Sequence, residues 1–179
     1  MRRVLFLILC SSPAWSAVVD SAATGFTVRT TLEIQAPVEQ VHDKLLQVGN
    51  WWSPRHTFFG DAHNLSIEAK PMGCFCEKPP PGKGFVRHME VVYLGPDKLV
   101  MLGGLGPLQG LATTGSMTIL LTALATNGAG TNTKLELTYT VSGYLANGLN
   151  TWAAPVDAML AEQFTRLQHY VEHGNPEPK

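Results

Sequence analysis

Hydrophobic and polar residues follow two different periods along this chain, and the change of period indicates its architecture. Residues 25–35 (GFTVRTTLEIQ) alternate, with Phe26, Val28 and Leu32 on one face, which predicts a half-buried strand. Further apolar segments are bounded by turns rich in Gly, Pro and Asn. They predict strands at residues 64–68, 74–78, 84–94, 98–103, 115–125 and 131–145.

The last long segment has the period of a helix instead. Residues 150–173 repeat apolar side chains at steps of three and four, from Trp152 to Val171. A shorter helix is predicted over residues 37–48 and a second short helix or turn over residues 50–54. A long amphipathic helix after antiparallel strands needs a sheet to pack against. The pattern therefore predicts an α+β domain over residues 25–173, with a frayed tail over residues 174–179.

The N-terminus has the pattern of a secretory signal peptide. Arg2 and Arg3 precede an apolar run at residues 4–10, which is too short to span a bilayer. Ala14-Trp15-Ser16 places small residues where a signal peptidase reads them. We therefore expect a signal peptide over residues 1–16, with Ser21-Ala22-Ala23 as an alternative cleavage site that would extend it to residue 23. The protein would then be exported, periplasmic or secreted.

Composition and net charge limit the classes of partner that we expect the protein to bind. The 179 residues are 45% apolar and 15% charged, which fits one globular domain. Without Arg2 and Arg3, 11 basic side chains face 14 acidic ones, a net charge of −3. Because no other Lys/Arg cluster occurs, we expect no nucleic-acid binding and no stable membrane insertion. No protein partner can be identified from the sequence.

Cys74 and Cys76 lie two residues apart on a predicted strand, where their thiols share a face. Three interpretations remain open. A disulfide requires the strand to bulge, because alternate Cα atoms of an extended strand lie near the upper limit for a disulfide. Half of a metal site would need further His or Cys ligands, and the chain has no second cysteine pair. The third interpretation is two buried apolar thiols.

The element order and several motifs resemble one known superfamily. A strand followed by Ala36-Pro37-x-x-x-Val41, the Trp51-Trp52 pair and the long final helix are similar to the helix-grip (SRPBCC) superfamily. It includes START lipid-transfer domains, polyketide cyclases/dehydrases, birch-pollen-allergen-like proteins and chaperone-ATPase-activator-like proteins. The segments Gly73–Glu77, Val91–Tyr93, Gly103–Gln109 and Gly143-Tyr144 resemble exported bacterial members near the cyclase and activator-like branch.

The resemblance implies a helix-grip fold: a curved antiparallel sheet of about seven strands around the C-terminal helix, with two short helices after the first strand. It also implies a cavity under that helix. It supplies no catalytic residue, because such residues differ between the branches, so any catalytic residues remain unknown.

The loop over residues 103–115 is expected to cover the cavity mouth, with an ordinary surface loop as the alternative. It lacks the Gly-Lys-Ser/Thr of a phosphate-binding loop, and we expect no metal and no cofactor. The expected cavity lining combines aromatic rings, methionines, leucines and one cation. It comprises Trp51, Trp52, Phe58, Phe59, Arg87, Met89, Met101, Leu105, Leu108, Met117, Tyr139, Trp152 and Met159.

The segment 84–94 carries the candidate polar chemistry. Its more apolar face holds Phe85, Met89 and Tyr93 together with Arg87, which predicts Arg87 inside or at the rim as an anchor for a ligand carboxylate. A salt bridge to Glu77 is the alternative for Arg87. His88 and Glu90 would then form a solvated pair on the outer face.

Three functions follow as hypotheses. The first is binding of a small hydrophobic or amphipathic ligand, such as a lipid- or polyketide-like molecule. The second is a cyclase/dehydratase-type enzyme, which requires at least two of Glu77, Arg87, His88 and Glu90 to converge in the cavity. The third is a protein-interaction module, which a large exposed apolar patch would support.

Overall fold

A computed structural model describes residues 15–125 and 131–177. The strands are β1 (Trp15–Ala22), β2 (Gly25–Ile34), β3 (Leu65–Ile67), β4 (Cys74–Glu77), β5 (Val86–Leu94), β6 (Lys98–Leu102), β7 (Ala112–Ala125) and β8 (Thr131–Tyr144). The α-helices in these residues are α1 (Val38–Leu46) and α2 (Asn150–His173). The α+β architecture predicted from the sequence is confirmed.

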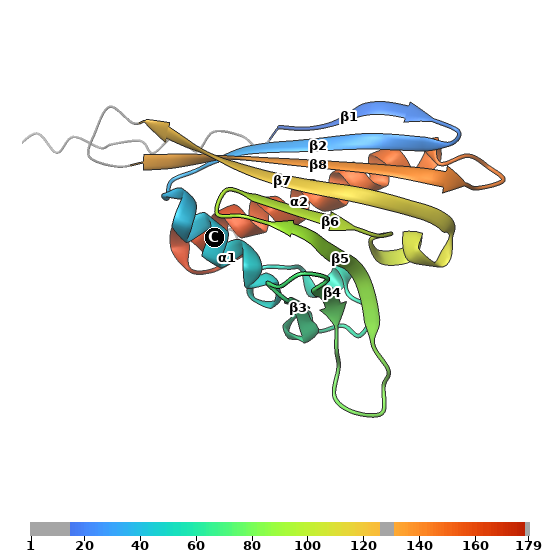
Figure 1. Cartoon of the computed structure of the whole chain (residues 1–179), viewed down its shortest axis with the longest axis horizontal. Coiled ribbons are helices and arrows are strands. Elements are labelled where there is room, and N and C mark those ends of the chain that lie inside the picture. Colours follow the sequence, from blue (N-terminus) through green and yellow to red (C-terminus); the bar gives the residue numbers. More distant parts are fainter. Residues whose placement is uncertain (1–14, 126–130, 178–179) are drawn as a thin grey trace, which may run out of the picture.

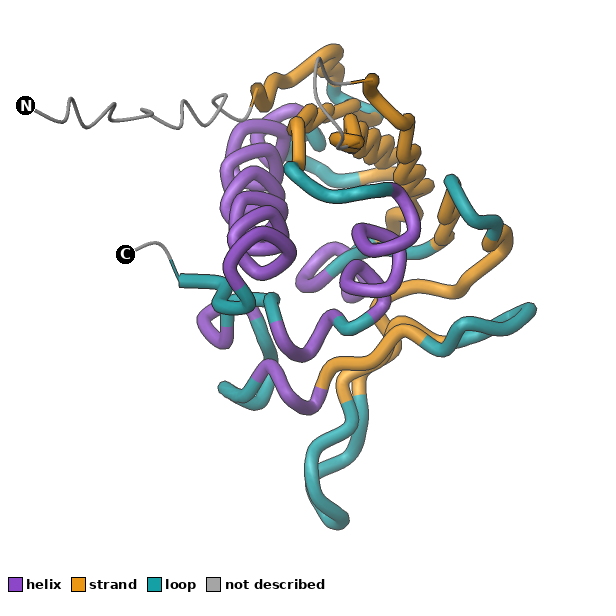
Figure 2. The backbone as a smooth tube through the Cα atoms, turned by 90° about the vertical axis from the view of Figure 1, so that its left-hand side faces the viewer, coloured by secondary structure: helices purple, strands orange, loops and turns teal. Residues whose placement is uncertain are grey.

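The strands form one antiparallel sheet in the order β1-β2-β8-β7-β6-β5-β4-β3. Figure 1 shows α2 running along the long strands of this sheet, with α1 near the C-terminal end of α2. Figure 2 looks roughly along α2 and shows that the sheet curves around this helix. The apolar faces of helix and sheet are thereby enclosed in one core.

Two details of the elements differ from the expectation. The sheet has eight strands rather than about seven, because β1 pairs antiparallel with β2 at the boundary of the expected signal peptide. The second short helix expected after the first strand is replaced by 3-10 turns at Val48–Asn50 and Pro54–His56. Pro54 explains the break, since the residue before a proline disfavours helical backbone.

Buried and exposed residues alternate along β2, as the sequence pattern predicts. Phe26, Val28 and Leu32 are buried on the face toward α2, while Arg29 and Glu33 are exposed. Apolar residues of β8 continue the same layer, with Leu135, Leu137 and Tyr139 fully buried. Among the strands, α2 lies closest to β2 and to its neighbour β1.

Polar side chains of α2 fix the segment that carries the tryptophan pair. Oε1 of Gln163 accepts the backbone N–H of Ser53 at 2.7 Å, and Nε of Arg166 donates to the carbonyl of Trp51 at 2.9 Å. Both bonds are buried, where a satisfied hydrogen bond is worth most. The segment 51–59 is therefore fixed relative to α2. Neither α1 nor α2 combines the length and hydropathy needed to cross a bilayer.

Candidate functional site: a cavity under the C-terminal helix

A cavity of about 350 Å³ lies between the N-terminal half of α2, the segment after the tryptophan pair, the strands β3 to β5 and the loop after β6. Its walls are mostly apolar, with aromatic rings contributed by α2, by the segment 52–58 and by strands β4 and β5. The lining residues are Trp52, Arg55, His56, Thr57, Phe58, Leu65, Phe75, His88, Leu105, Gly106, Pro107, Leu108, Trp152, Pro155, Val156 and Met159.

The cavity reaches the surface between two loops. Phe58 from the segment after the tryptophan pair is 52% exposed, and Pro107 from the loop after β6 is exposed as well. Both residues also line a second, shallower hollow beside Phe85 and Arg87. Phe58 and Pro107 thus stand at the mouth, while Phe75 and Leu108 close the interior end.

Two ionisable side chains meet at the inner wall of the cavity. Oε2 of Glu77 on β4 lies 3.6 Å from Nε2 of His88 on β5, and both side chains are buried. The two carboxylate oxygens of Glu77 also accept the backbone N–H groups of Phe58 and Phe59, at 2.9 and 2.8 Å. Glu77 therefore ties the mouth segment to the sheet and sets the position of the imidazole.

A β-bulge explains why His88 faces inward. The β4–β5 pairing joins Phe75 to Met89 and Cys76 to Arg87, which leaves His88 without a partner residue. The extra residue turns His88 and Met89 to the same side, so that both are buried.

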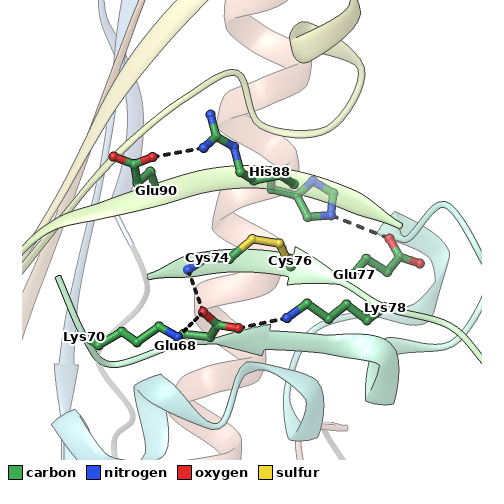
Figure 3. The surroundings of a disulfide bond; sticks show 9 residues. Glu68, Lys70, Cys74, Cys76, Glu77, Lys78, His88 and Glu90 are labelled. Carbon is green, nitrogen blue, oxygen red and sulfur yellow. Dashed lines mark hydrogen bonds and ion pairs between the residues drawn. A yellow bond between two sulfur atoms is a disulfide. The ribbon is translucent and has the colours of Figure 1, made fainter. Parts of the chain in front are cut away.

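The predicted faces of this strand were therefore wrong. Arg87 points outward, with its side chain 61% exposed, and Nη1 of Arg87 pairs with Oε2 of Glu90 at 2.9 Å. His88, expected on the outer face beside Glu90, is 5% exposed and lines the cavity. In Figure 3 the His88 ring points toward Glu77, away from Glu90. A strict period of two cannot reproduce a bulge, and the expected positions of Arg87 and His88 are therefore exchanged.

Cys74 and Cys76 are joined by a disulfide on β4, opposite the bulge (Figure 3). Their Cα atoms are 5.2 Å apart, closer than the roughly 6.6 Å of alternate residues in an extended strand. β4 is therefore shortened at the point where β5 carries its extra residue. Beside the disulfide, hydrogen bonds from Lys78 and then Lys70 lower the pKa of Glu68 to about 2.

The loop after β6 is held closed by a buried tyrosine. The backbone N–H of Leu105 donates to Oη of Tyr139 at 2.9 Å, and this hydroxyl donates to the carbonyl of Gly103 at 3.2 Å. Burial raises the pKa of Tyr139 to about 12, so that the hydroxyl keeps its proton. Residues 106–110 form a 3-10 helix that carries Leu108 into the cavity, and β7 begins at Ala112, earlier than the predicted residue 115.

His88 is the polar group that the cavity presents. Its Nδ1 and Nε2 atoms are buried and have no hydrogen-bond partner in the structure. Burial lowers the pKa of His88, although the Glu77 carboxylate acts in the opposite direction. The imidazole is therefore neutral near pH 7, with one donor and one acceptor nitrogen. Among residues 15–125 and 131–177, no group of three or more His, Cys, Asp or Glu side chains is placed to hold a metal ion.

The expected lining residues fall into three groups. Trp52, Phe58, Leu105, Leu108, Trp152 and Met159 line the cavity. Trp51, Met89, Met101, Met117 and Tyr139 are buried in the core around it rather than in its wall. Phe59 contributes its backbone N–H to Glu77, and Arg87 lies outside.

The sequence did not predict ten of the lining residues, which are Arg55, His56, Thr57, Leu65, Phe75, His88, Gly106, Pro107, Pro155 and Val156. Val156 stands on the apolar face of α2 and follows from helical spacing, as Phe75 follows from a buried strand. No sequence pattern of this kind identifies His88 as a lining residue.

Comparison of the sequence with protein-family models gives no match. Comparison with curated protein sequences gives none either. Solved structures do match. CalU16 from Micromonospora echinospora has a TM-score of 0.57 at 12% identity over 93% of this chain and 88% of its own. Ara h 8.0201 has a TM-score of 0.54 at 13% identity over 82% of this chain and 97% of its own.

A third similar structure is the di-domain ARO/CYC StfQ from the steffimycin biosynthetic pathway. Its TM-score is 0.54 at 16% identity, over 85% of this chain and 52% of StfQ. Each of the three matches covers at least 82% of this chain. The chain has a helix-grip fold. In this fold, the cavity described above lies between the sheet and the long C-terminal helix, toward the N-terminal end of α2.

Proposed function

We propose that this helix-grip protein binds a small, neutral, hydrophobic or amphipathic molecule in the cavity beneath α2. The observation that carries the proposal is a cavity of about 350 Å³ with apolar walls and one buried, unpartnered imidazole. Small-molecule sites are typically concave, mostly apolar and supplied with a few polar groups that fix orientation. The cavity stands at the small end of the usual range of roughly 300 to 1,000 Å³.

The charges at the mouth favour a neutral ligand. Arg55 lies 2.8 Å from Oε1 of Glu162 on α2, and His56 lies 3.3 Å from Oε2 of the same residue. The guanidinium of Arg55 is therefore already paired with a carboxylate. An anionic ligand would have to compete with Glu162 for it. Affinity would instead come from apolar burial, at roughly 25 cal/mol for each Å² removed from water.

The fold likeness to Ara h 8.0201 and to the ARO/CYC StfQ supports a cavity-based function without naming a ligand. We infer that the ligand is a compact ring system or a short branched chain. A long acyl chain would extend through the mouth at Phe58 and Pro107.

A fluorescence titration tests the proposal. The apolar dye N-phenyl-1-naphthylamine gains fluorescence when it leaves water, and we expect saturable binding by the wild-type protein. Val156→Phe fills the cavity from α2, whereas Val92→Phe makes the same change on the outer face of β5, where Val92 is 48% exposed. We expect V156F to weaken dye binding at least tenfold and V92F to leave it unchanged. Equal affinity of the three proteins would reject the proposal.

We also propose that the protein works in an oxidising compartment, after removal of its N-terminal signal. The disulfide between Cys74 and Cys76 supports this, because disulfides persist mainly in exported proteins. Pairing of β1 with β2 favours cleavage after Ser16, which keeps residues 17–22 in the sheet. N-terminal sequencing of protein recovered from the cell envelope or the medium would test this. An intact Met1 in cytosolic protein would contradict it.

A second candidate function is an acid–base enzyme of the cyclase/dehydratase type. His88 lines the cavity and the buried Glu77 lies behind it, with Oε2 3.6 Å from Nε2 of His88, while Arg87 and Glu90 pair with each other away from His88. A neutral imidazole can take a proton from the carbon beside a carbonyl group, and the carboxylate stabilises the imidazolium that forms.

The test uses 2-tetralone in D₂O, where NMR measures exchange of the protons beside its carbonyl. We expect the wild-type protein to accelerate this exchange and His88→Leu to abolish the acceleration. Exchange at the uncatalysed rate in both proteins would remove the enzymatic candidate and leave the binding proposal standing.

A further inference from the structure

The buried imidazole of His88 has more hydrogen-bonding capacity than the protein uses. The residue is 5% exposed, yet neither ring nitrogen has a hydrogen-bond partner among the described residues. Buried polar groups in native proteins are nearly always satisfied, by protein, water or ligand. His88 lines a cavity of ligand size and lacks such partners. Its imidazole is therefore available to form a hydrogen bond with a molecule that enters the cavity.

The neighbours of His88 determine which nitrogen carries the proton. Oε2 of Glu77 faces Nε2, 3.6 Å away, and the backbone N–H of Phe58 already donates to the same oxygen. This carboxylate oxygen can only accept, although 3.6 Å is too long for a hydrogen bond to Nε2. It thus favours the tautomer with the proton on Nε2, which leaves the lone pair of Nδ1 as the free acceptor of the ring.

Two aromatic rings lie beside the imidazole of His88. The ring centroid of Phe75 lies 5.2 Å from that of His88, and the ring centroid of Phe58 lies 5.9 Å away. No competing hydrogen-bond donor reaches the imidazole from either ring. Trp152 and Met159 of α2 supply further apolar wall of the same cavity.

We infer that the ligand of this cavity carries a hydroxyl group, phenolic or alcoholic, on a compact ring system. The hydroxyl donates a hydrogen bond to Nδ1 of His88, while the rings pack between Phe75 and the side chains of α2. This inference rests on the proposed function and names the chemical class that the cavity selects.

The test compares two bicyclic compounds of nearly equal shape. 2-Naphthol carries the hydroxyl, and 2-methylnaphthalene replaces it with a methyl group. In equilibrium dialysis at pH 7.5 we expect wild-type protein to bind 2-naphthol about threefold to tenfold tighter, the factor that one net hydrogen bond supplies. In His88→Leu the order should reverse, because the methyl compound is the more apolar.

Arg87→Gln is the matched control, since Arg87 is the preceding residue of β5 and points away from the cavity. It should keep the preference of the wild-type protein. A second measurement needs no variant: the ¹⁵N resonance of His88 Nδ1 should move on addition of 2-naphthol but not of 2-methylnaphthalene.

The hydroxyl inference and the proposal that the cavity binds a ligand are contradicted by different results. If both compounds bind wild-type protein equally and the Nδ1 resonance stays in place, a buried water satisfies His88. The hydroxyl inference is then wrong while the cavity still binds. If neither compound binds, the proposed function itself is rejected.

Discussion

Glu77 and His88 meet inside the protein, with Oε2 of the carboxylate 3.6 Å from Nε2 of the imidazole. Glu77 comes from β4 and His88 from the bulge of β5, so their meeting depends on the irregular pairing of these strands. The same carboxylate also holds the backbone of Phe58 and Phe59 at the cavity mouth. A single buried residue thus connects the sheet, the mouth and the polar group of the cavity.

Replacing Glu77 should therefore loosen the mouth as well as the pair. In Glu77→Gln, one of the two backbone N–H groups meets an amide NH₂ instead of an oxygen and is left unsatisfied. We expect a loss of about 1 to 3 kcal/mol in the free energy of unfolding, measured by urea denaturation. Glu90→Gln breaks only the surface pair with Arg87 and should change stability by less than about 1 kcal/mol. Equal losses in the two variants would show that Glu77 does not hold the mouth.

Acid should destabilise the wild-type protein through His88. The folded-state pKa of His88 lies below its ordinary value of 6.5, because burial outweighs the opposing Glu77 carboxylate. As the pH falls through 6.5, the unfolded chain takes up this proton before the folded protein does. Stability is then lost by up to about 1.4 kcal/mol for each pH unit, until the folded-state pKa is reached.

His88→Leu removes this contribution. The difference in unfolding free energy between wild type and H88L should therefore shift in favour of the variant between pH 7.5 and pH 5.5. Urea denaturation at both pH values measures it, and a difference independent of pH would show that the folded protein does not resist protonation of His88.

Tyr139 should control the loop after β6. In Tyr139→Phe the buried N–H of Leu105 loses its acceptor, which we expect to cost about 1 to 3 kcal/mol of stability. Hydrogen exchange at Leu105 should accelerate, because the loop opens locally more often. Tyr144→Phe is the matched control, since Tyr144 is 75% exposed, and it should change neither quantity.

Gly115 should tolerate no side chain for a related reason. A Cβ atom there would lie 2.5 Å from Cε2 of Tyr139 and 2.9 Å from the carbonyl oxygen of Gly103. Gly115→Ala must displace the tyrosine that holds the loop, and we expect a lower melting temperature together with weaker dye binding. Gly110→Ala meets nothing within 4 Å and should behave as wild type. A variant G115A as stable as G110A would mean that the loop does not depend on this packing.

The fold follows from the sequence because its signals are local and regular. The alternation in residues 25–35 and the helical spacing from Trp152 to Val171 each correspond to an element that the structure contains. Part of the apolar lining of the cavity can be predicted from the sequence for the same reason, as at Trp152 and Met159.

The polar part of the site does not follow, because it depends on one inserted residue. The bulge at His88 breaks the period of two and exchanges the positions expected for Arg87 and His88. Burial of Glu77 likewise depends on two backbone N–H groups nearly twenty residues away, a pairing that no residue pattern records.

The central claim is that a small apolar molecule occupies the cavity under α2. A crystal structure of the protein with N-phenyl-1-naphthylamine bound tests it most directly. We expect the dye between α2 and the loop after β6, in contact with Phe75, Trp152 and Met159. A dye molecule bound only on the outer surface, with the cavity filled by the protein's own side chains, would contradict the account.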